Sequence, residues 1–127
     1  MPNALLSLLG RILLAVVFIP SGLQKFGDIA GTAGYISSVG LPAGSLLAWA
    51  AAIFEVGAGI AILVGFQTKL VALAFAAFCV FLALVFHLQT ADQMQMIMFF
   101  KNLGLAGGFL TLAAHGAGEW SVDAKRG

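Results

Sequence analysis

The residues of this sequence that could carry out chemistry lie within or beside long apolar runs. A carboxylate near basic groups can transfer protons, histidine titrates near neutral pH, and lysine can donate hydrogen bonds to a bound ligand. A charge at the centre of a membrane helix costs roughly 2.5 to 3.5 kcal/mol on insertion scales, so such side chains are expected to face a bundle interior. The candidates are Arg11, Glu55, His87 and Lys101, together with Lys25 in "FIPSGLQKFG" and Asn102 beside Lys101.

Composition places these residues in a membrane protein. Hydrophobic residues make up 61% of the 127 residues, charged residues make up 9%, and the mean hydropathy is +1.07. Soluble domains usually carry about a quarter charged residues, so lipid must cover most of this surface. The formal net charge of +1 provides no basic field for nucleic acid. The bilayer is therefore the first predicted partner.

Four apolar runs are each near the roughly 20 residues that a helix needs to cross a bilayer. Their lack of strand-like alternation predicts an all-α, integral membrane four-helix bundle, and residues 1–127 are interpreted as a single four-span domain. The stretch "DIAGTAGYISSVGLP" predicts a short interfacial helix capped by Asp28 and ended by Gly40 and Pro42. The expected spans are about 4–24, 45–64, 70–88 and 96–114.

The basic residues predict how the spans are oriented. With both termini in the cytoplasm, the inner side holds Lys69, Lys125 and Arg126, with Arg11 nearest to it. The other side then holds only Lys25 and Lys101. Cytoplasmic segments of membrane proteins are enriched in lysine and arginine, which favours this orientation.

Helical spacing places each charged side chain on the same helix face as a row of small residues. Such faces are where membrane helices approach closely, so the charged side chains are predicted to share one polar core. Depth counted from the span ends predicts an Arg11–Glu55 ion pair, with Lys25, His87 and Lys101 toward the other end. The phenylalanines from Phe75 to Phe86 are expected to face lipid. The stripes are Arg11, Ala15, Phe18, Gly22 and Lys25; Ala48, Ala51, Ala52, Glu55, Ala58 and Gly59; Ala72, Ala76, Cys79, Ala83 and His87; and Lys101, Gly104, Gly108 and Thr111.

Several residues have a structural interpretation as well as a functional one. Pro20 could bend its helix and aim Lys25 into the bundle, or Lys25 could extend to the headgroups at a helix end. Arg11 and Glu55 could fix helix register without taking part in chemistry. His87 could be an interfacial histidine or a proton donor. These alternatives stay open at the level of the sequence.

The same residues argue against resident cofactors. Two haem-ligating histidines must lie at matching depth, whereas His87 and His115 are expected near opposite faces. No cluster has metal-ligand spacing, and the single cysteine, Cys79, excludes a Cys-x-x-Cys pair within this chain. We expect no haem and no metal, so redox chemistry would need a diffusible quinone or a carrier on a partner.

The order of several short motifs resembles the DoxX family of small bacterial membrane proteins. The motifs are Arg11, "SGLQKF", "GLP" at 40–42, Glu55 followed by Gly57 and Gly59, "GFQTK" at 65–69, His87, "KN" at 101–102, and "WSVD" at 120–123. The resemblance implies a four-helix bundle in the bacterial inner membrane, linked to oxidoreductase complexes. It also implies that Ser121 and Asp123 cap or tether the C-terminal tail.

Three functions compete at this stage. In the first, the protein is a quinone-linked oxidoreductase subunit, in which Glu55 and His87 transfer protons and Arg11, Lys25, Lys101 and Asn102 bind the quinone. In the second, it is a non-catalytic anchor that docks a peripheral redox protein through the tail "EWSVDAKRG". In the third, a small solute or proton passes through the polar core, which would require oligomerisation.

Overall fold

The computed structural model describes residues 3–86 and 92–126. This part of the chain is helical without strands, which confirms the all-α prediction. Four of its helices are long and apolar enough to cross a membrane: α1 (Asn3–Gly27), α3 (Gly44–Val64), α4 (Thr68–Phe86) and α5 (Gln93–His115). The protein is therefore an integral membrane helix bundle.

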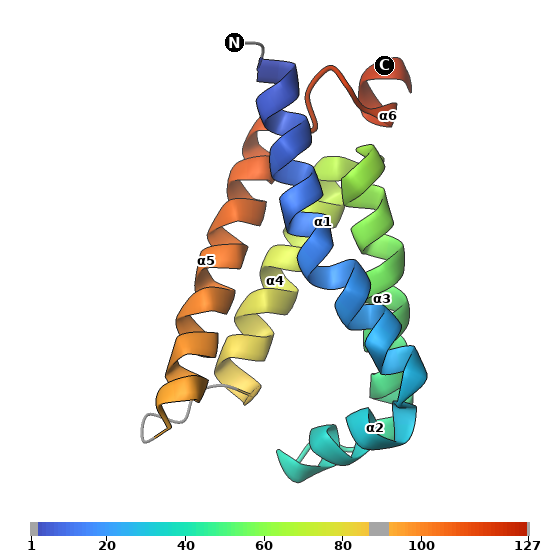
Figure 1. Ribbon diagram of the computed structural model, residues 1–127, viewed down its shortest axis with the longest axis vertical. Helices are drawn as coiled ribbons and strands as arrows, with labels where there is room; N and C mark the ends of the chain where they lie inside the picture. The colour runs from blue at the N-terminus through green and yellow to red at the C-terminus, as the bar shows by residue number, and fades with distance from the viewer. Residues whose placement is uncertain (1–2, 87–91, 127) are drawn as a thin grey trace.

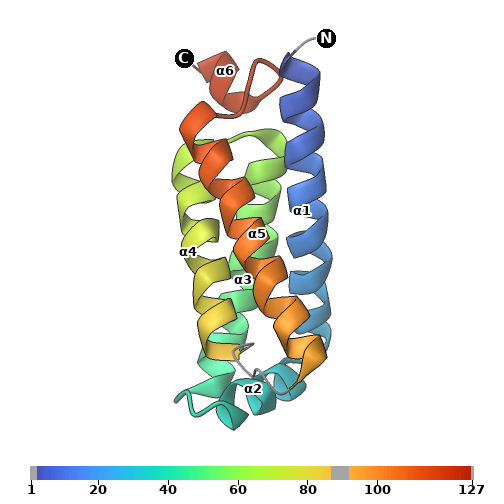
Figure 2. The same ribbon diagram turned by 90° about the vertical axis from the view of Figure 1, so that its left-hand side faces the viewer.

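Two short helices complete the fold. The helix α2 (Ile29–Ser38) lies across one end of the bundle, and α6 (Val122–Arg126) lies at the other end beside both termini (Figures 1 and 2). Asp28 caps α2 by accepting a hydrogen bond from the backbone N–H of Gly31, as the sequence predicted. We call these the α2 end and the terminal end of the bundle.

The long helices form two pairs, because α1 packs along α3 and α4 packs along α5. The pairs lie close together near the terminal end and diverge toward α2 (Figure 1). The helix α2 packs mainly on α3, where Ile36 joins Ala48 and Phe86 in a small apolar cluster. The two helix pairs are thus farther apart at the α2 end than at the terminal end.

Stacked phenylalanines fill the bundle where the two pairs meet. Phe75 and Phe109 stack with ring centroids 4.7 Å apart, and Phe18 of α1 contacts both rings. The expectation that the phenylalanines of α4 face lipid is wrong for Phe75 and Phe86, which are buried, whereas Phe81 is exposed.

The small-residue stripes face the core in three of the four long helices. The predicted stripes of α1, α3 and α4 are buried or half-buried over the described residues. The prediction is wrong for α5, where Lys101, Gly104 and Thr111 are exposed. The buried face of α5 instead carries Asn102, Ala106 and Phe109, because the large ring of Phe109 stacks on α4.

Candidate functional site

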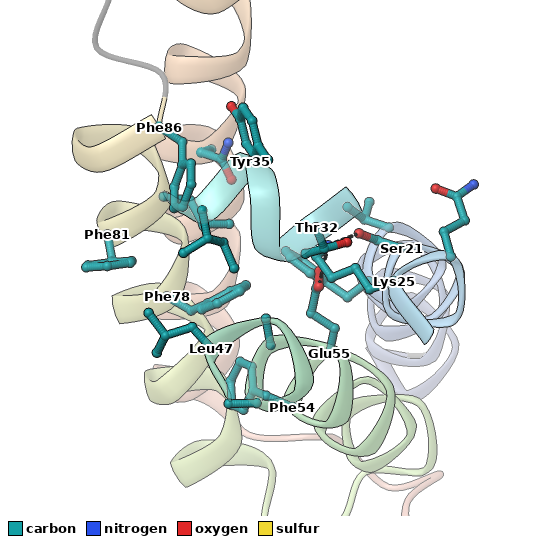
Figure 3. Close-up of a pocket in the computed structure, with 18 of the residues that line it drawn as sticks. Ser21, Lys25, Thr32, Tyr35, Leu47, Phe54, Glu55, Phe78, Phe81 and Phe86 are labelled. Atoms are coloured by element: carbon teal, nitrogen blue, oxygen red, sulfur yellow. Dashed lines mark hydrogen bonds and ion pairs between the residues drawn. The ribbon is translucent and has the colours of Figure 1, made fainter. Parts of the chain in front are cut away.

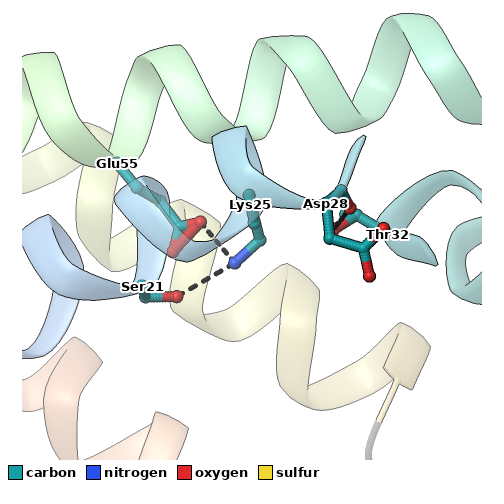
Figure 4. A network of polar contacts seen from close by, with 5 residues as sticks. All are labelled: Ser21, Lys25, Asp28, Thr32 and Glu55. Carbon is teal, nitrogen blue, oxygen red and sulfur yellow. Dashed lines mark hydrogen bonds and ion pairs between the residues drawn. The ribbon is translucent and has the colours of Figure 1, made fainter. Parts of the chain in front are cut away.

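A buried ion pair joins α1 to α3 near the α2 end. Lys25 Nζ lies 2.6 Å from Glu55 Oε1 and donates a hydrogen bond of 2.9 Å to Ser21 Oγ (Figure 4). The Glu55 side chain is 3% exposed and that of Lys25 is 27% exposed. Of the two alternatives for Lys25, the structure places its ammonium inside the bundle, where it compensates the buried carboxylate.

The close approach of α1 to α3 explains why these two side chains meet. Gly22 lies against α3, where a Cβ would be 3.0 Å from both the Ala52 carbonyl oxygen and the Glu55 Cβ. Lys25 is three residues beyond Gly22 and therefore on the same face of α1. A small residue at position 22 lets the helices approach until the ammonium reaches the carboxylate.

The ion pair lies on the wall of a cavity of about 1230 Å³ that fills the α2 end between the two helix pairs. We call this space the α2-end cavity (Figure 3). Its polar lining residues are Ser21, Gln24, Lys25, Asp28, Thr32, Tyr35, Glu55, Lys101 and Asn102. Much of the remaining wall is aromatic or aliphatic and includes Val17, Leu47, Phe54, Phe78, Phe81 and Phe86. An apolar cavity with a few convergent polar groups is the usual form of a small-molecule site.

The cavity has a floor and an exposed side. Toward the terminal end, Phe18, Phe54 and Phe78 line it and belong to or pack on the buried phenylalanine cluster. Toward the side, Ala50 and Ala77 line it and are exposed on the surface that lipid covers. The cavity therefore ends within the bundle, and part of its wall on α3 and α4 is exposed.

Lys101 and Asn102 reach the same cavity from α5. The Asn102 side chain is buried and donates from Nδ2 to the Met98 carbonyl oxygen at 3.0 Å, while Lys101 is exposed. Both line the α2-end cavity together with Lys25 and Glu55. Four of the six candidate residues thus share one space. His87 lies outside the described residues, so its predicted role stays a prediction.

The predicted Arg11–Glu55 ion pair is wrong. Arg11 is buried at the other end of the bundle, where it donates from Nη1 to the carbonyl oxygens of Ile62, at 3.3 Å, and Leu63, at 2.7 Å. Its Nη2 donates to the carbonyl oxygen of Trp120. The last carbonyls of a helix have no intrahelical partner and carry partial negative charge, so the end of α3 can accept a buried cation.

The error arose because depth was counted from the ends of the expected spans. In the structure, Gly22 lies beside Glu55, and Gly59 lies beside Ile19. This register extends the start of α1 beyond the end of α3. Arg11 therefore lies level with the last turn of α3, and Glu55 lies level with the second half of α1.

The C-terminal tail is tied to the turn between α3 and α4. Asp123 accepts hydrogen bonds from the backbone N–H groups of Gln67, at 2.7 Å, and Thr68, at 2.8 Å, where α4 begins. The Asp123 N–H donates to the Gly65 carbonyl oxygen at 2.8 Å. Ser121 accepts a hydrogen bond from the N–H of Ala124. The tether that the resemblance implied for Ser121 and Asp123 is confirmed.

Sequence reasoning missed several polar residues of the cavity. Ser21 is one helical turn before Lys25, and this spacing could have marked it as a partner of the ammonium. Thr32 and Tyr35 reach the cavity from α2, whose position over the bundle end no local pattern encodes. Among the described residues, no group of three or more histidine, cysteine, aspartate or glutamate residues could hold a metal ion.

Comparison with known proteins identifies the family. Residues 6–88, which run from the first turn of α1 past the end of α4, match the DoxX family. The chain belongs to the DoxX family. No solved structure matches it significantly.

Two DoxX relatives cover almost the whole chain. The chain is 41% identical to the inner membrane protein YqjF of Escherichia coli (strain K12) over 116 residues, which cover 91% of this chain and 88% of YqjF. It is 37% identical to the inner membrane protein YphA of the same organism over 125 residues, covering 94% of this chain and 89% of YphA.

A third relative is similar over a shorter segment. This protein, named "Putative oxidoreductase CatD", comes from Bacillus subtilis (strain 168). It is 34% identical over 70 residues, which cover 55% of this chain and 51% of CatD.

Proposed function

We propose that this DoxX protein is a quinone-binding subunit of an oxidoreductase system in the bacterial inner membrane. The observation that carries the proposal is the α2-end cavity, in which the Lys25–Glu55 ion pair lies among apolar walls. We propose that this cavity is reached from the bilayer. The names of YqjF and YphA support the inner membrane location, and the name of CatD supports the class of chemistry. We also propose the orientation that the basic residues predict, with both termini in the cytoplasm.

The cavity residues fit the chemistry of a quinone. Its headgroup presents carbonyl oxygens, which accept hydrogen bonds, on a flat apolar ring. Phe54 and Phe78 provide aromatic surface for such a ring, and the cavity volume of about 1230 Å³ is somewhat larger than the roughly 300 to 1,000 Å³ of typical ligand pockets, so a quinone headgroup would fill only part of it. A bound quinone would accept two electrons and two protons and leave as a quinol.

The residues of this chain would bind the headgroup and supply protons. An ammonium group has three N–H donors, and Lys25 directs its Nζ toward Glu55 and Ser21. A further N–H is available for a ligand oxygen in the cavity. Lys25 can transfer a proton to that oxygen, and the carboxylate of Glu55 would then take up a proton from water and pass it to the neutral amine of Lys25. A second turn of the same relay would supply the second proton of the quinol. Lys101 and Asn102 would contact the headgroup from α5.

The two electrons would come from a partner redox protein. The sequence contains a single cysteine, Cys79, which is buried in the phenylalanine cluster. This chain therefore has no dithiol of its own to supply two electrons to a bound ligand. We propose that this partner is a peripheral membrane protein.

The other two functions have less support from the geometry. Docking through a free C-terminal tail is weakened because Asp123 caps α4 and Arg11 binds the Trp120 carbonyl oxygen. Passage of a solute through one chain is weakened because stacked Phe75 and Phe109 fill the bundle beyond the cavity floor. Both features therefore favour the α2-end cavity as the proposed site of chemistry.

Quinone retention tests the proposed function. The protein is purified in mild detergent, and co-purifying quinones are quantified by mass spectrometry for wild type, Lys25→Met, Asn102→Ala and Lys69→Ala. We expect quinone in wild type and in Lys69→Ala, because Lys69 lies at the terminal end. We expect loss in Lys25→Met and reduced retention in Asn102→Ala. Equal retention by Lys25→Met and wild type, or no quinone in wild type, would count against the proposal.

A further inference from the structure

A second hollow lies on the outside of the bundle and shares residues with the cavity. This groove of about 510 Å³ runs between α4 and α5 and is lined by Leu73, Ala76, Ala77, Val80, Phe81 and Leu110. Ala77 and Phe81 also line the α2-end cavity. We call this hollow the α4–α5 groove. The two spaces are therefore adjacent along α4.

The cavity has polar groups on one side and the groove has none, so together they match a molecule with a polar head and an apolar chain. The ion pair and Ser21 lie on the α1 and α3 side of the cavity, whereas the groove is lined only by apolar residues. Phe78 points toward α3 in the cavity, and Phe81 lies on the outer side of α4 (Figure 3). A polar head at Lys25 and an apolar chain on α4 would thus fit a single ligand.

We infer that the α4–α5 groove holds the isoprenoid chain of the quinone whose headgroup lies beside Lys25. The inference rests on the proposed function. It adds the path of the isoprenoid chain along the protein and the residues that would favour quinones with such a chain. The chain leaves the cavity over the small side chain of Ala77 and lies along Val80 and Leu110. Ala77 and Val80 are exposed on the lipid-facing surface, so the ligand can enter from the bilayer without opening the bundle.

The inference identifies Val80 as a residue that would contact the isoprenoid chain but not the headgroup. Val80 lines the groove and is absent from the cavity wall. Its side chain is 39% exposed, so a larger side chain can be accommodated without repacking the core. Val80→Trp would fill the groove while leaving Lys25, Glu55 and Phe78 in place. A matched control is Ala114→Trp, at an exposed position of α5 outside both spaces.

The test compares two quinones with the same head. Binding of a dimethoxy-methyl-benzoquinone without a side chain and of its decyl derivative is measured for the full chain in lipid nanodiscs. We expect Val80→Trp to raise the Kd of the decyl derivative about tenfold or more, and to change that of the chainless quinone less than about twofold. Ala114→Trp should leave both dissociation constants at the wild-type values. Retained binding of the chainless quinone also shows that the variant is folded.

The results separate failure of the inference from failure of the proposed function. If wild type binds neither quinone, the proposed function fails and the inference fails with it. If wild type binds both quinones and Val80→Trp weakens neither, or weakens both equally, only the route of the chain is wrong. A photoreactive group at the end of the decyl chain gives a second readout. Labelling of Leu73, Val80 or Leu110 supports the route, and labelling confined to Phe54 and Phe78 overturns it.

Discussion

Gly22 of α1 and Glu55 of α3 are in direct contact across the helix interface. A Cβ at position 22 would lie 3.0 Å from the Glu55 Cβ and 2.6 Å from Cγ2 of Val56. This contact sets the register of the two helices, and the register brings Lys25 to the carboxylate. The geometry of the candidate site therefore depends on a residue that has no polar side chain.

Replacing Gly22 should disturb both stability and the site. We expect Gly22→Ala to lower the free energy of unfolding by about 1 to 3 kcal/mol, because the added methyl group forces α1 away from α3. Thermal unfolding in detergent measures the loss. The matched control is Gly57→Ala on α3, where a Cβ meets nothing within 4 Å. This variant should be neutral or more stable by up to about 1 kcal/mol, since alanine favours helix. Equal effects of the two substitutions would contradict the close contact.

Lys25 and Glu55 should be energetically coupled. Two side chains in one ion pair are typically coupled by about 0.5 to 3 kcal/mol, so Lys25→Met and Glu55→Gln should each destabilise the protein, while the double variant loses less than the sum. Lys25→Met should cost more, because it leaves the more deeply buried partner, Glu55, without its cation. A double-mutant cycle of thermal unfolding measures the coupling. Strictly additive losses would show that the pair does not stabilise the fold.

Arg11 should hold the C-terminal tail in place. We expect Arg11→Lys to release the tail, because one ammonium cannot reproduce the contacts of Nη1 with Ile62 and Leu63 and of Nη2 with Trp120. The loss should be about 1.5 to 3 kcal/mol. Fluorescence of Trp120 in a Trp49→Phe background reports release of the tail. Lys69→Arg is the control, and unchanged Trp120 emission in Arg11→Lys would show that other contacts suffice.

Asp123 should stabilise the start of α4. Loss of a side chain that accepts hydrogen bonds from the first N–H groups of a helix costs about 0.5 to 2 kcal/mol, so Asp123→Ala should lower the unfolding temperature. Asp123→Asn should cost less, because the amide retains one accepting oxygen. Glu119→Ala, at an exposed position of the tail, is the control. An Asp123→Ala variant as stable as wild type would show that backbone contacts alone tether the tail.

The sequence by itself determined the membrane fold and much of the buried surface. Long apolar runs allow only structures that satisfy their own backbone hydrogen bonds, so helices followed directly. The stripe of Arg11, Ala15, Phe18 and Gly22 was predicted correctly, because helical spacing fixes which side chains share a face. On α5 the same rule selected the wrong face. Small residues can face either lipid or another helix, and only the stacking of Phe109 on Phe75 decided between them.

The tertiary structure decided which charged side chains meet. Spacing placed Arg11, Lys25 and Glu55 on inner faces, but it does not encode the relative shift of two neighbouring helices. Close packing at Gly22 set that shift, paired Glu55 with Lys25, and left Arg11 to bind the end of α3 and the tail. The cavity likewise depends on how far the two helix pairs diverge. Local sequence determines which side a helix buries, whereas the summed contacts between helices determine its partner and its depth.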